Sequence, residues 1–426
     1  MSFLKVKEFL LFLFLLFIPT QFGKHFWPEW SYVLGVRVDY LSPVLYFLDL
    51  IWLLLFLFDW IKPSVDKSTS PLTGRSFFSF KTILLILFVA INVLVAQNKE
   101  ICIYRWLRLW QLIWTIFYLN KNKVLFKKLL IKIISIWVIF EGFLAISQII
   151  YGGSLGGLFY FFGERRFDFN TIGIAQMSLM GQGLVRAYGS FSHPNSLAGF
   201  GLVSLLLWMK LRMKSSCSME RTSSLKKRGS LLWFWVVFWF GVVILVVSGS
   251  RLIWFLSLIL GLIFIFKRIK QKKIWISVLS MTVVLLVTII FIIRVNYPLN
   301  NFVGGFDKDS FNKRWDLNVA SLKMVKERGW IGYGMGNFLV ELPNFQKNGY
   351  FWLQPVHNVI LLILTETGLL GFGVLVFGMG NFLVKKKISK MNILILVIIL
   401  ITGMWDHYWI TLPQNWWLLA VVLAQI

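Results

Sequence analysis

The stretch FNKRWDLNVASLKMVKERGWIGYGMGNF, residues 311–338, lies in the only long segment of this chain that is neither a hydrophobic run nor a short basic connector. Apolar residues recur in its first half at helical spacing: Phe311, Trp315, Val319, Leu322 and Val325. This spacing predicts an amphipathic helix with these five residues on one apolar stripe. Asp309 or Ser310 is the expected N-cap of that helix.

The residues around this helix predict where its polar groups and its end lie. Arg314 falls off the apolar stripe, with Asn318 and Ser321 beside it. Gly329 suits the left-handed residue just past a helix end, and WIGYGMGNF, residues 330–338, then reads as a glycine-spaced turn region. The whole segment from Arg294 to Asn358 carries more Lys and Arg than Asp and Glu. We therefore expect a water-facing loop that attracts anions.

The composition of the chain indicates a membrane protein. Of 426 residues, 58% are hydrophobic and only 15% are charged, which lies outside the range of soluble globular proteins. The formal net charge is +26. The basic residues stand in short clusters between apolar runs without a nucleic-acid-binding motif, so we expect no nucleic-acid partner and explain them by the positive-inside rule.

The apolar runs predict about twelve membrane spans, and hence an all-α bundle in a single integral membrane domain covering residues 1–426. They fall near residues 4–19, 40–58, 80–97, 101–119, 129–150, 195–212, 231–248, 251–266, 274–293, 355–377, 391–406 and 412–426. With the N-terminus in the cytoplasm, the cytoplasmic segments hold most of the 44 Lys and Arg. Both termini are then cytoplasmic. The loop at 294–356, between spans nine and ten, is extracytoplasmic.

The motif RAYGSFSHPN, residues 186–195, precedes one of the expected spans on the outer side. Pro194 suits the first residue of that helix, because its missing N–H would have no partner there. A helix N-terminus next to Arg186 and His193 offers a phosphate site. Simple capping and anchoring at the membrane interface explain the motif about equally well.

A second motif, SGSR at residues 248–251, predicts a tight outer hairpin between two spans. Its arginine, Arg251, either reaches back to the membrane interface or faces a polar cavity. On this motif alone the first explanation is the better one.

Two histidine motifs stand at the outer ends of later spans. His357 and Asn358 begin one span. A histidine at a membrane interface is usually structural. This histidine, however, closes the cationic loop, and its ordinary pKa of about 6.5 suits a general base or a phosphate-binding group. Asp406 and His407 lie among tryptophans typical of an interfacial aromatic belt. No further ligand stands at a recognisable spacing, so we expect no metal site and no cofactor.

Charged residues also occur inside the apolar runs, where they are costly unless they pair or line a cavity. They are Asp49, Glu141 and Glu366 on the acidic side, and Arg105 and Arg108 on the basic side. Such residues also suit the ion path of a transporter. A transporter or flippase for an anionic lipid-linked glycan is therefore the alternative function.

Four motifs, taken in chain order, resemble the O-antigen ligase and polymerase superfamily over about residues 180–375: RAYGSFSHPN, SGSR, KRWDLNVASLKMVKERGWIGYGMGNF and HNVILLILTETGLLG. The resemblance implies a GT-C-like membrane glycosyltransferase. Such an enzyme moves a polyprenyl-diphosphate-linked glycan to an acceptor on the outer face of the cytoplasmic membrane. It implies catalytic positions at Arg186, Arg314 and His357, and substrate-binding positions at Arg251, His193, Asn195 and Asn358.

The substrate of such enzymes defines the expected chemistry. Arginines hold the diphosphate through bidentate contacts, and the anomeric carbon is attacked from the opposite face and inverted. His357 acts as the base or itself binds phosphate, and the arginines leave no charge that requires a metal. The expected partners are the donor, a glycan, lipid or protein acceptor, and the bilayer; the choice between ligase and polymerase stays open.

Overall fold

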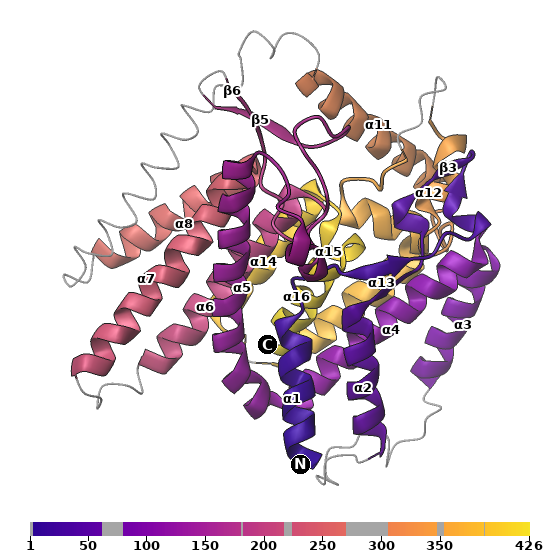
Figure 1. Ribbon diagram of the computed structural model, residues 1–426. Coiled ribbons are helices and arrows are strands. Elements are labelled where there is room, and N and C mark those ends of the chain that lie inside the picture. Colours follow the sequence, from indigo (N-terminus) through magenta and orange to yellow (C-terminus); the bar gives the residue numbers. More distant parts are fainter. Residues whose placement is uncertain are drawn as a thin grey trace.

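The computed structural model describes residues 3–61, 80–179, 182–216, 224–269, 306–346, 353–386 and 388–426, and over these it is mostly helical (Figure 1). The longer helices are α1 Phe3–Leu16, α2 Phe47–Ile61, α3 Phe80–Leu94, α4 Lys99–Lys121, α5 Lys123–Tyr151, α6 Pro194–Ser216, α7 Ser224–Val247, α8 Arg251–Ile269, α11 Phe306–Glu327, α13 Val359–Val384, α14 Lys390–Trp405 and α16 Pro413–Ala424. The helical bundle expected from the sequence is confirmed at this level.

Short elements lie in the connections between these helices. They are the one-turn helices α12 Phe338–Glu341 and α15 Tyr408–Thr411, and the strands β1 Gly23–His25, β2 Tyr32–Val33, β3 Val36–Arg37, β4 Val44–Tyr46, β5 Gln176–Leu179 and β6 Gln182–Val185. The strands form three antiparallel pairs, β1 with β4, β2 with β3 and β5 with β6. Because β4 pairs with β1, α2 begins at Phe47 and not near residue 40, where the apolar run begins.

The number of membrane spans is tested only in part. Among the described residues, three helical segments are long and apolar enough to cross a bilayer: Lys123–Tyr151, Pro194–Met213 and Val359–Val384. Shorter apolar helices are Thr82–Leu94, Leu231–Val247, Arg251–Ile263 and Lys390–Trp405. The expected span at 274–293 lies outside the described residues. Twelve spans, the GT-C-like class and the loop boundaries at 294–356 therefore stay predictions.

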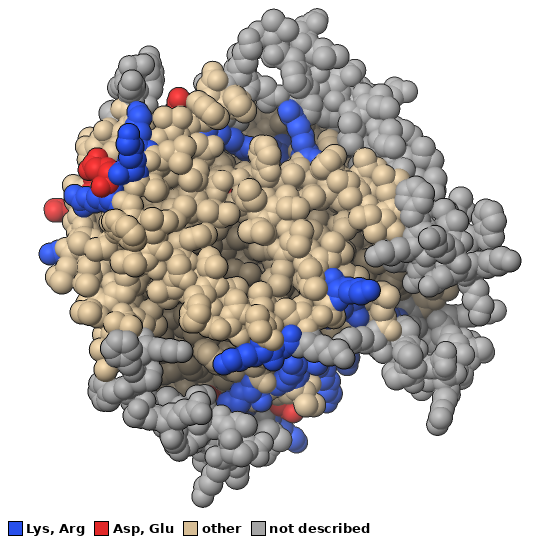
Figure 2. Space-filling model, turned by 180° about the vertical axis from the view of Figure 1, so that it is seen from behind, with Lys and Arg blue, Asp and Glu red and all other residues tan. Residues whose placement is uncertain are grey.

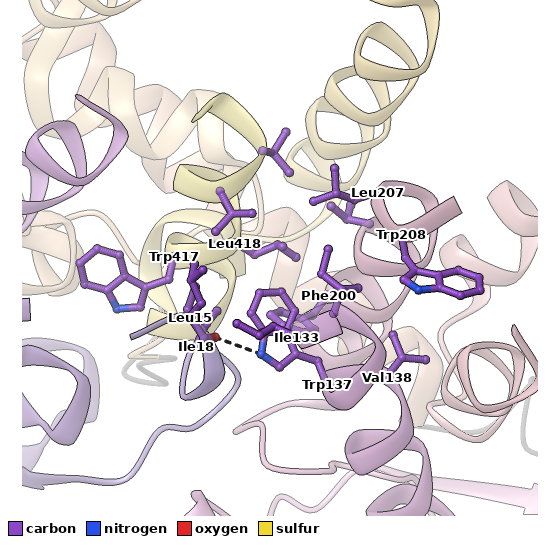
Figure 3. Packing of buried hydrophobic residues seen from close by; sticks show 14 of the residues in the cluster. Leu15, Ile18, Ile133, Trp137, Val138, Phe200, Leu207, Trp208, Trp417 and Leu418 are labelled. Carbon is purple, nitrogen blue, oxygen red and sulfur yellow. Dashed lines mark hydrogen bonds between the residues drawn. The ribbon is translucent and has the colours of Figure 1, made fainter. Parts of the chain in front are cut away.

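The surface and the core both fit a membrane protein. On the face seen in Figure 2, charged side chains are sparse across the middle and gather toward the upper and lower edges. Inside, α5 packs against α6 and α7, and α16 packs against α4 and α6. Trp137 of α5 donates from Nε1 to the Leu15 carbonyl at 3.1 Å, which ties α5 to α1 beside Phe200 and Leu418 (Figure 3).

The helix expected around residues 311–325 is present as α11, but it differs from the prediction in three ways. It begins at Phe306, before the expected cap at Asp309 or Ser310, so that part of the prediction is wrong. Gly329 does not adopt a left-handed backbone; Gly332, Gly334 and Gly336 do. Most of the apolar stripe does not pack on the described part of the protein: Phe311, Trp315 and Leu322 are 65%, 59% and 55% exposed, and the two valines are half-buried.

The face of α11 that packs inward is the one that carries Arg314. Leu317, Ala320, Ser321 and Met324 are buried on it, and it lies against α13. The Ser321 hydroxyl is 2.7 Å from that of Thr365. Arg314 lies seven positions before Ser321 on α11, about two helical turns. His357 lies eight positions before Thr365. This register brings Arg314 toward the residues that precede α13.

The glycine-spaced segment after α11 inserts into a break in α13. Gly368 has φ +66° and ψ −174°, which interrupts the helix. The backbone of residues 329–334 replaces the lost helical bonds: Tyr333 N donates to Thr365 O at 3.0 Å, and Leu369 N donates to Gly329 O at 2.7 Å. Asn92 closes the junction by donating to both Ile331 O and Glu366 O at 3.0 Å. Non-helical backbone within an apolar span is tolerated here because protein groups satisfy it.

Of the charges that the sequence predicts either to pair or to line a cavity within the apolar runs, Arg108 and Asp49 form an ion pair, and Glu141 is held by hydrogen bonds from an uncharged residue. Arg108 donates from Nη2 to Asp49 Oδ2 at 2.9 Å, and Glu141 accepts from the Ser190 hydroxyl at 2.6 Å and from the Ser190 amide at 3.0 Å.

Candidate functional site

The first component of the site is Arg186, which follows β6 and is held by the turn between α7 and α8. Its Nε donates to Ser248 O at 2.7 Å, and Ala187 N donates to Val247 O at 3.1 Å. Gly249 has φ +64°, and a Cβ there would lie 2.9 Å from Arg186 Nε. The predicted SGSR hairpin is therefore present, and its tight turn leaves room for the guanidinium.

A chain of hydrogen bonds runs from Arg186 to the last connection of the protein. Arg186 Nη2 donates to Asn195 Oδ1 at 2.7 Å, and Asn195 Nδ2 donates to Asp406 Oδ2 at 3.1 Å. The other oxygen of Asp406 accepts from His407 N at 2.8 Å. Pro194 is the first residue of α6, as its chemistry predicts, so Asn195 sits in the first turn of that helix.

Three imidazoles surround the Asp406 carboxylate. The rings of His357 and His407 are 5.1 Å apart, edge to face, and His407 Nδ1 lies 2.7 Å from Thr411 Oγ1. His193 is close enough to Asp406 to interact with it electrostatically. His357 Nδ1 is buried and has no hydrogen-bond partner among the described residues, so its lone pair or proton is available to a ligand.

The site keeps the imidazoles neutral and the carboxylate ionised. Burial lowers the pKa of His357, the Asp406 charge opposes this, and the positive charge of Arg314 adds to it. Burial likewise lowers the pKa of His407 to about 3. Burial alone would raise the pKa of Asp406, but the positive charge that the neighbouring histidines, His407 first, carry once they are protonated in acid, together with the Asn195 amide, holds that pKa well below its usual range.

One part of the chain is similar to a known protein family. Residues 236–376 match the family model described as O-antigen ligase. The match covers about a third of the chain and supports a place in the O-antigen ligase and polymerase superfamily. No curated protein and no solved structure gives a significant match to the chain.

The O-antigen ligase match covers part of the site. It begins within α7 and ends within α13, and it contains Arg251, Arg314, His357 and Asn358. The resemblance that the motifs indicate is therefore confirmed. Arg186 and Asp406 lie outside the matched residues, yet the fold places them in the same cluster.

The structure brings some of the predicted site residues together and leaves others apart. Arg186, His193, Asn195 and His357 meet around Asp406, and Arg314 is near enough to influence the pKa of three histidines. Arg251 is the first residue of α8, and its side chain is exposed.

Asn358 has a structural task in the described structure. Its side chain caps α13 by accepting from Ile360 N at 2.9 Å and Leu361 N at 3.1 Å. The substrate-binding roles given to Arg251, His193, Asn195 and Asn358 stay predictions.

Sequence reasoning missed Asp406 as the centre of the cluster and Arg165 as a neighbouring cation. Arg165 Nη1 donates to Ser192 O at 3.3 Å, next to His193. The signal in the sequence for Asp406 was the adjacent Asp406–His407 pair at the end of an apolar run. The basic pair Arg165–Arg166 in an outer connection was the signal for the second.

The cluster also contains a set of possible metal ligands. The ligand atoms of His357, Asp406 and His407 all lie within 4.8 Å of one another. Two imidazoles and a carboxylate form a donor set that suits first-row transition metals. Against this, Asp406 already accepts two hydrogen bonds, and Arg314 places a positive charge nearby. His357 joins the adjacent Asp406 and His407 only in the folded structure, so spacing in the sequence does not reveal this ligand set.

Proposed function

We propose that this protein is a membrane glycosyltransferase that moves a polyprenyl-diphosphate-linked glycan to an acceptor at the extracytoplasmic face of the cytoplasmic membrane. The O-antigen ligase match and the apolar helices support the general class. The observation that carries the proposal is that Arg186, which reaches Asp406 through Asn195, and Arg314, from a separate segment, lie near one group of histidines. Both termini are cytoplasmic in this proposal.

The proposed reaction uses the two arginines for the leaving group. Their guanidinium groups hold the diphosphate in bidentate fashion and stabilise the negative charge that grows on it. The acceptor oxygen forms a bond to the anomeric carbon while the bond from that carbon to the phosphate oxygen breaks. The diphosphate leaves with the electron pair, so the sugar is inverted.

His357 takes the acceptor proton in this scheme. Its buried Nδ1 has no partner among the described residues, and a lowered pKa keeps the ring neutral and able to accept a proton. Asp406 then faces the imidazolium and stabilises it. A phosphate-binding role for His357 is the alternative within the same reaction, and no metal is required for charge balance in either.

A transfer assay with the full-length protein in liposomes tests this function. The donor is the lipid-linked glycan extracted from the producing cells, and the readout is glycan joined to acceptor. We expect Arg314→Ala and His357→Ala to lower transfer by about a hundredfold to a thousandfold, as the loss of one charge-stabilising donor does. Arg314→Lys does not restore transfer, because a point charge cannot form the bidentate fork.

Lys326→Ala is the matched control, since Lys326 is an exposed cation on the same helix. It should transfer at the wild-type rate. Normal transfer by Arg314→Ala or His357→Ala would remove the catalytic assignment. Movement of the lipid across the bilayer without joined product would favour the transporter instead.

A further inference from the structure

Two cavities lie along the segment between α1 and α2, and they share a wall. The inner cavity, beside Tyr40, has a volume of about 650 Å³, and the outer cavity, beside Tyr160, has a volume of about 700 Å³. Arg37 and Asp39 line both, so the two cavities adjoin and form one groove. Most residues that line the two cavities belong to the indigo segment that follows α1, which in Figure 1 runs from the top of α1 toward β3.

The inner end of the groove reaches the histidine cluster. Tyr40 and Gln354 line the inner cavity. The Tyr40 ring lies edge to face with that of His407, with centroids 5.4 Å apart, and Gln354 is three residues before His357. Arg105 Nη2 donates to Tyr40 O at 2.6 Å and fixes that residue. A ligand in the inner cavity therefore contacts Tyr40, whose ring packs against His407 of the cluster.

The outer cavity combines aromatic surfaces with charged groups. The Arg37 guanidinium lies 4.3 Å from the centre of the Trp27 ring, and the His25 ring stacks on Trp27 at 5.4 Å. Tyr160 comes from a distant segment, lines the same cavity and is 47% exposed. Saccharides present C–H faces that pack on aromatic rings and hydroxyls that pair with arginine and carboxylate groups. This outer cavity offers both kinds of contact.

The outer cavity also borders apolar surface. Phe47 and Leu50 of α2 line it and are exposed, and Leu53, Leu54 and Leu57 continue the exposed apolar face along α2. In a membrane protein such a face contacts lipid tails. A ligand with a sugar head and a lipid tail can thus place its head in the cavity and its tail along α2.

We propose that the groove from Tyr160 through Arg37 and Asp39 to Tyr40 binds the saccharide of a membrane-anchored glycan and leads it to the histidine cluster. This inference rests on the proposed glycosyl transfer. The saccharide belongs to the acceptor or to the donor, since both carry sugars and a lipid anchor in this class of reaction. Kinetic measurements separate the two sources.

Binding is measured first, on the full-length protein in nanodiscs. The probe is radiolabelled oligosaccharide released by mild acid from the lipid-linked glycan of the producing cells, without lipid or diphosphate. We expect Tyr160→Ala and Arg37→Ala each to weaken binding about tenfold, because these two residues line the outer cavity from separate segments of the chain. Tyr151→Ala is the matched control, because Tyr151 is 71% exposed at the end of α5 and does not line either cavity.

Transfer kinetics with the same variants assign the saccharide. A KM raised about tenfold for the acceptor, with kcat within twofold of wild type, identifies an acceptor groove; the same change for the donor identifies a donor groove. Wild-type oligosaccharide binding by both Tyr160→Ala and Arg37→Ala would overturn the inference, as would an unchanged KM for both substrates.

Arg314→Ala separates this inference from the proposed function. It should bind the free oligosaccharide like the wild type while losing transfer. If Arg314→Ala transfers normally but the groove variants lose binding, the groove stands and the catalytic proposal fails. If the groove variants bind normally while Arg314→Ala is inactive, the catalytic proposal stands and the groove proposal fails.

Discussion

Asn195 Nδ2 donates to Asp406 Oδ2 at 3.1 Å, although the two residues lie 211 positions apart in the chain. The same side chain accepts from Arg186 at 2.7 Å. One amide therefore joins the N-terminus of α6 to the end of α14 and separates a guanidinium from a carboxylate. An amide suits this position because it donates and accepts at once.

The first prediction follows from this bridge. Asn195→Ala should lower kcat for transfer about tenfold to a hundredfold, because Arg186 and Asp406 each lose a partly buried hydrogen-bond partner, which costs about 1–3 kcal/mol. The measurement is initial-rate transfer at saturating substrates. Asn312→Ala, on the exposed side of α11, is the control. Equal rates for the two variants would show that the bridge does not position the site.

Stability should depend on pH through the histidine cluster. The pKa of His357 and that of His407 are lowered in the folded protein, whereas unfolding returns them to about 6.5. Below pH 6.5 the unfolded chain binds more protons than the folded one, so the free energy of unfolding falls as the pH falls. The lowered pKa of Asp406 adds stability that is lost only well below pH 5.

Thermal unfolding of the detergent-solubilised protein at pH 7.5 and pH 5 measures this effect. We expect a lower Tm at pH 5, and a smaller difference in His407→Gln because a glutamine does not titrate. A His407→Gln protein with the full wild-type pH dependence would contradict the assignment.

Metal removal is the third prediction. EDTA should leave transfer within about twofold of the untreated rate, because the positive charges of Arg186 and Arg314 hold the diphosphate. The three possible ligands make this a sharp test. Activity lost in EDTA and restored by Mn²⁺ or Zn²⁺ would assign His357, Asp406 and His407 as ligands.

The fourth prediction concerns the break in α13. Gly368→Ala should destabilise the protein by about 1–3 kcal/mol, because the backbone is left-handed and a Cβ would lie 2.4 Å from the Trp330 carbonyl. Gly373→Ala is the matched control on the same helix, since nothing lies within 4 Å of its added Cβ. The yield and Tm of the two purified variants decide the matter. Equal Tm values for Gly368→Ala and Gly373→Ala would show that the left-handed glycine at the break does not contribute to stability.

The sequence determined those features that depend on neighbours within one or two helical turns. Helical spacing predicted α11 and placed Arg314 away from the stripe of Phe311 and Trp315. The fixed backbone of Pro194 predicted the start of α6, and SGSR predicted the turn that holds Arg186. These outcomes follow from spacing and from local backbone preference, which every stretch of chain carries with it.

Tertiary structure alone decided which face of α11 packs inward. Two sets of residues at helical spacing compete on this helix, and the hydroxyl pair of Ser321 and Thr365 belongs to the less apolar one. The break at Gly368 is equally hidden, because the groups that satisfy it come from residues 329–334. Asp406 acquires its role only when Asn195 and His357 reach it from distant segments. Contacts between segments so far apart depend on how the helices pack, and no pattern within a single segment records that packing.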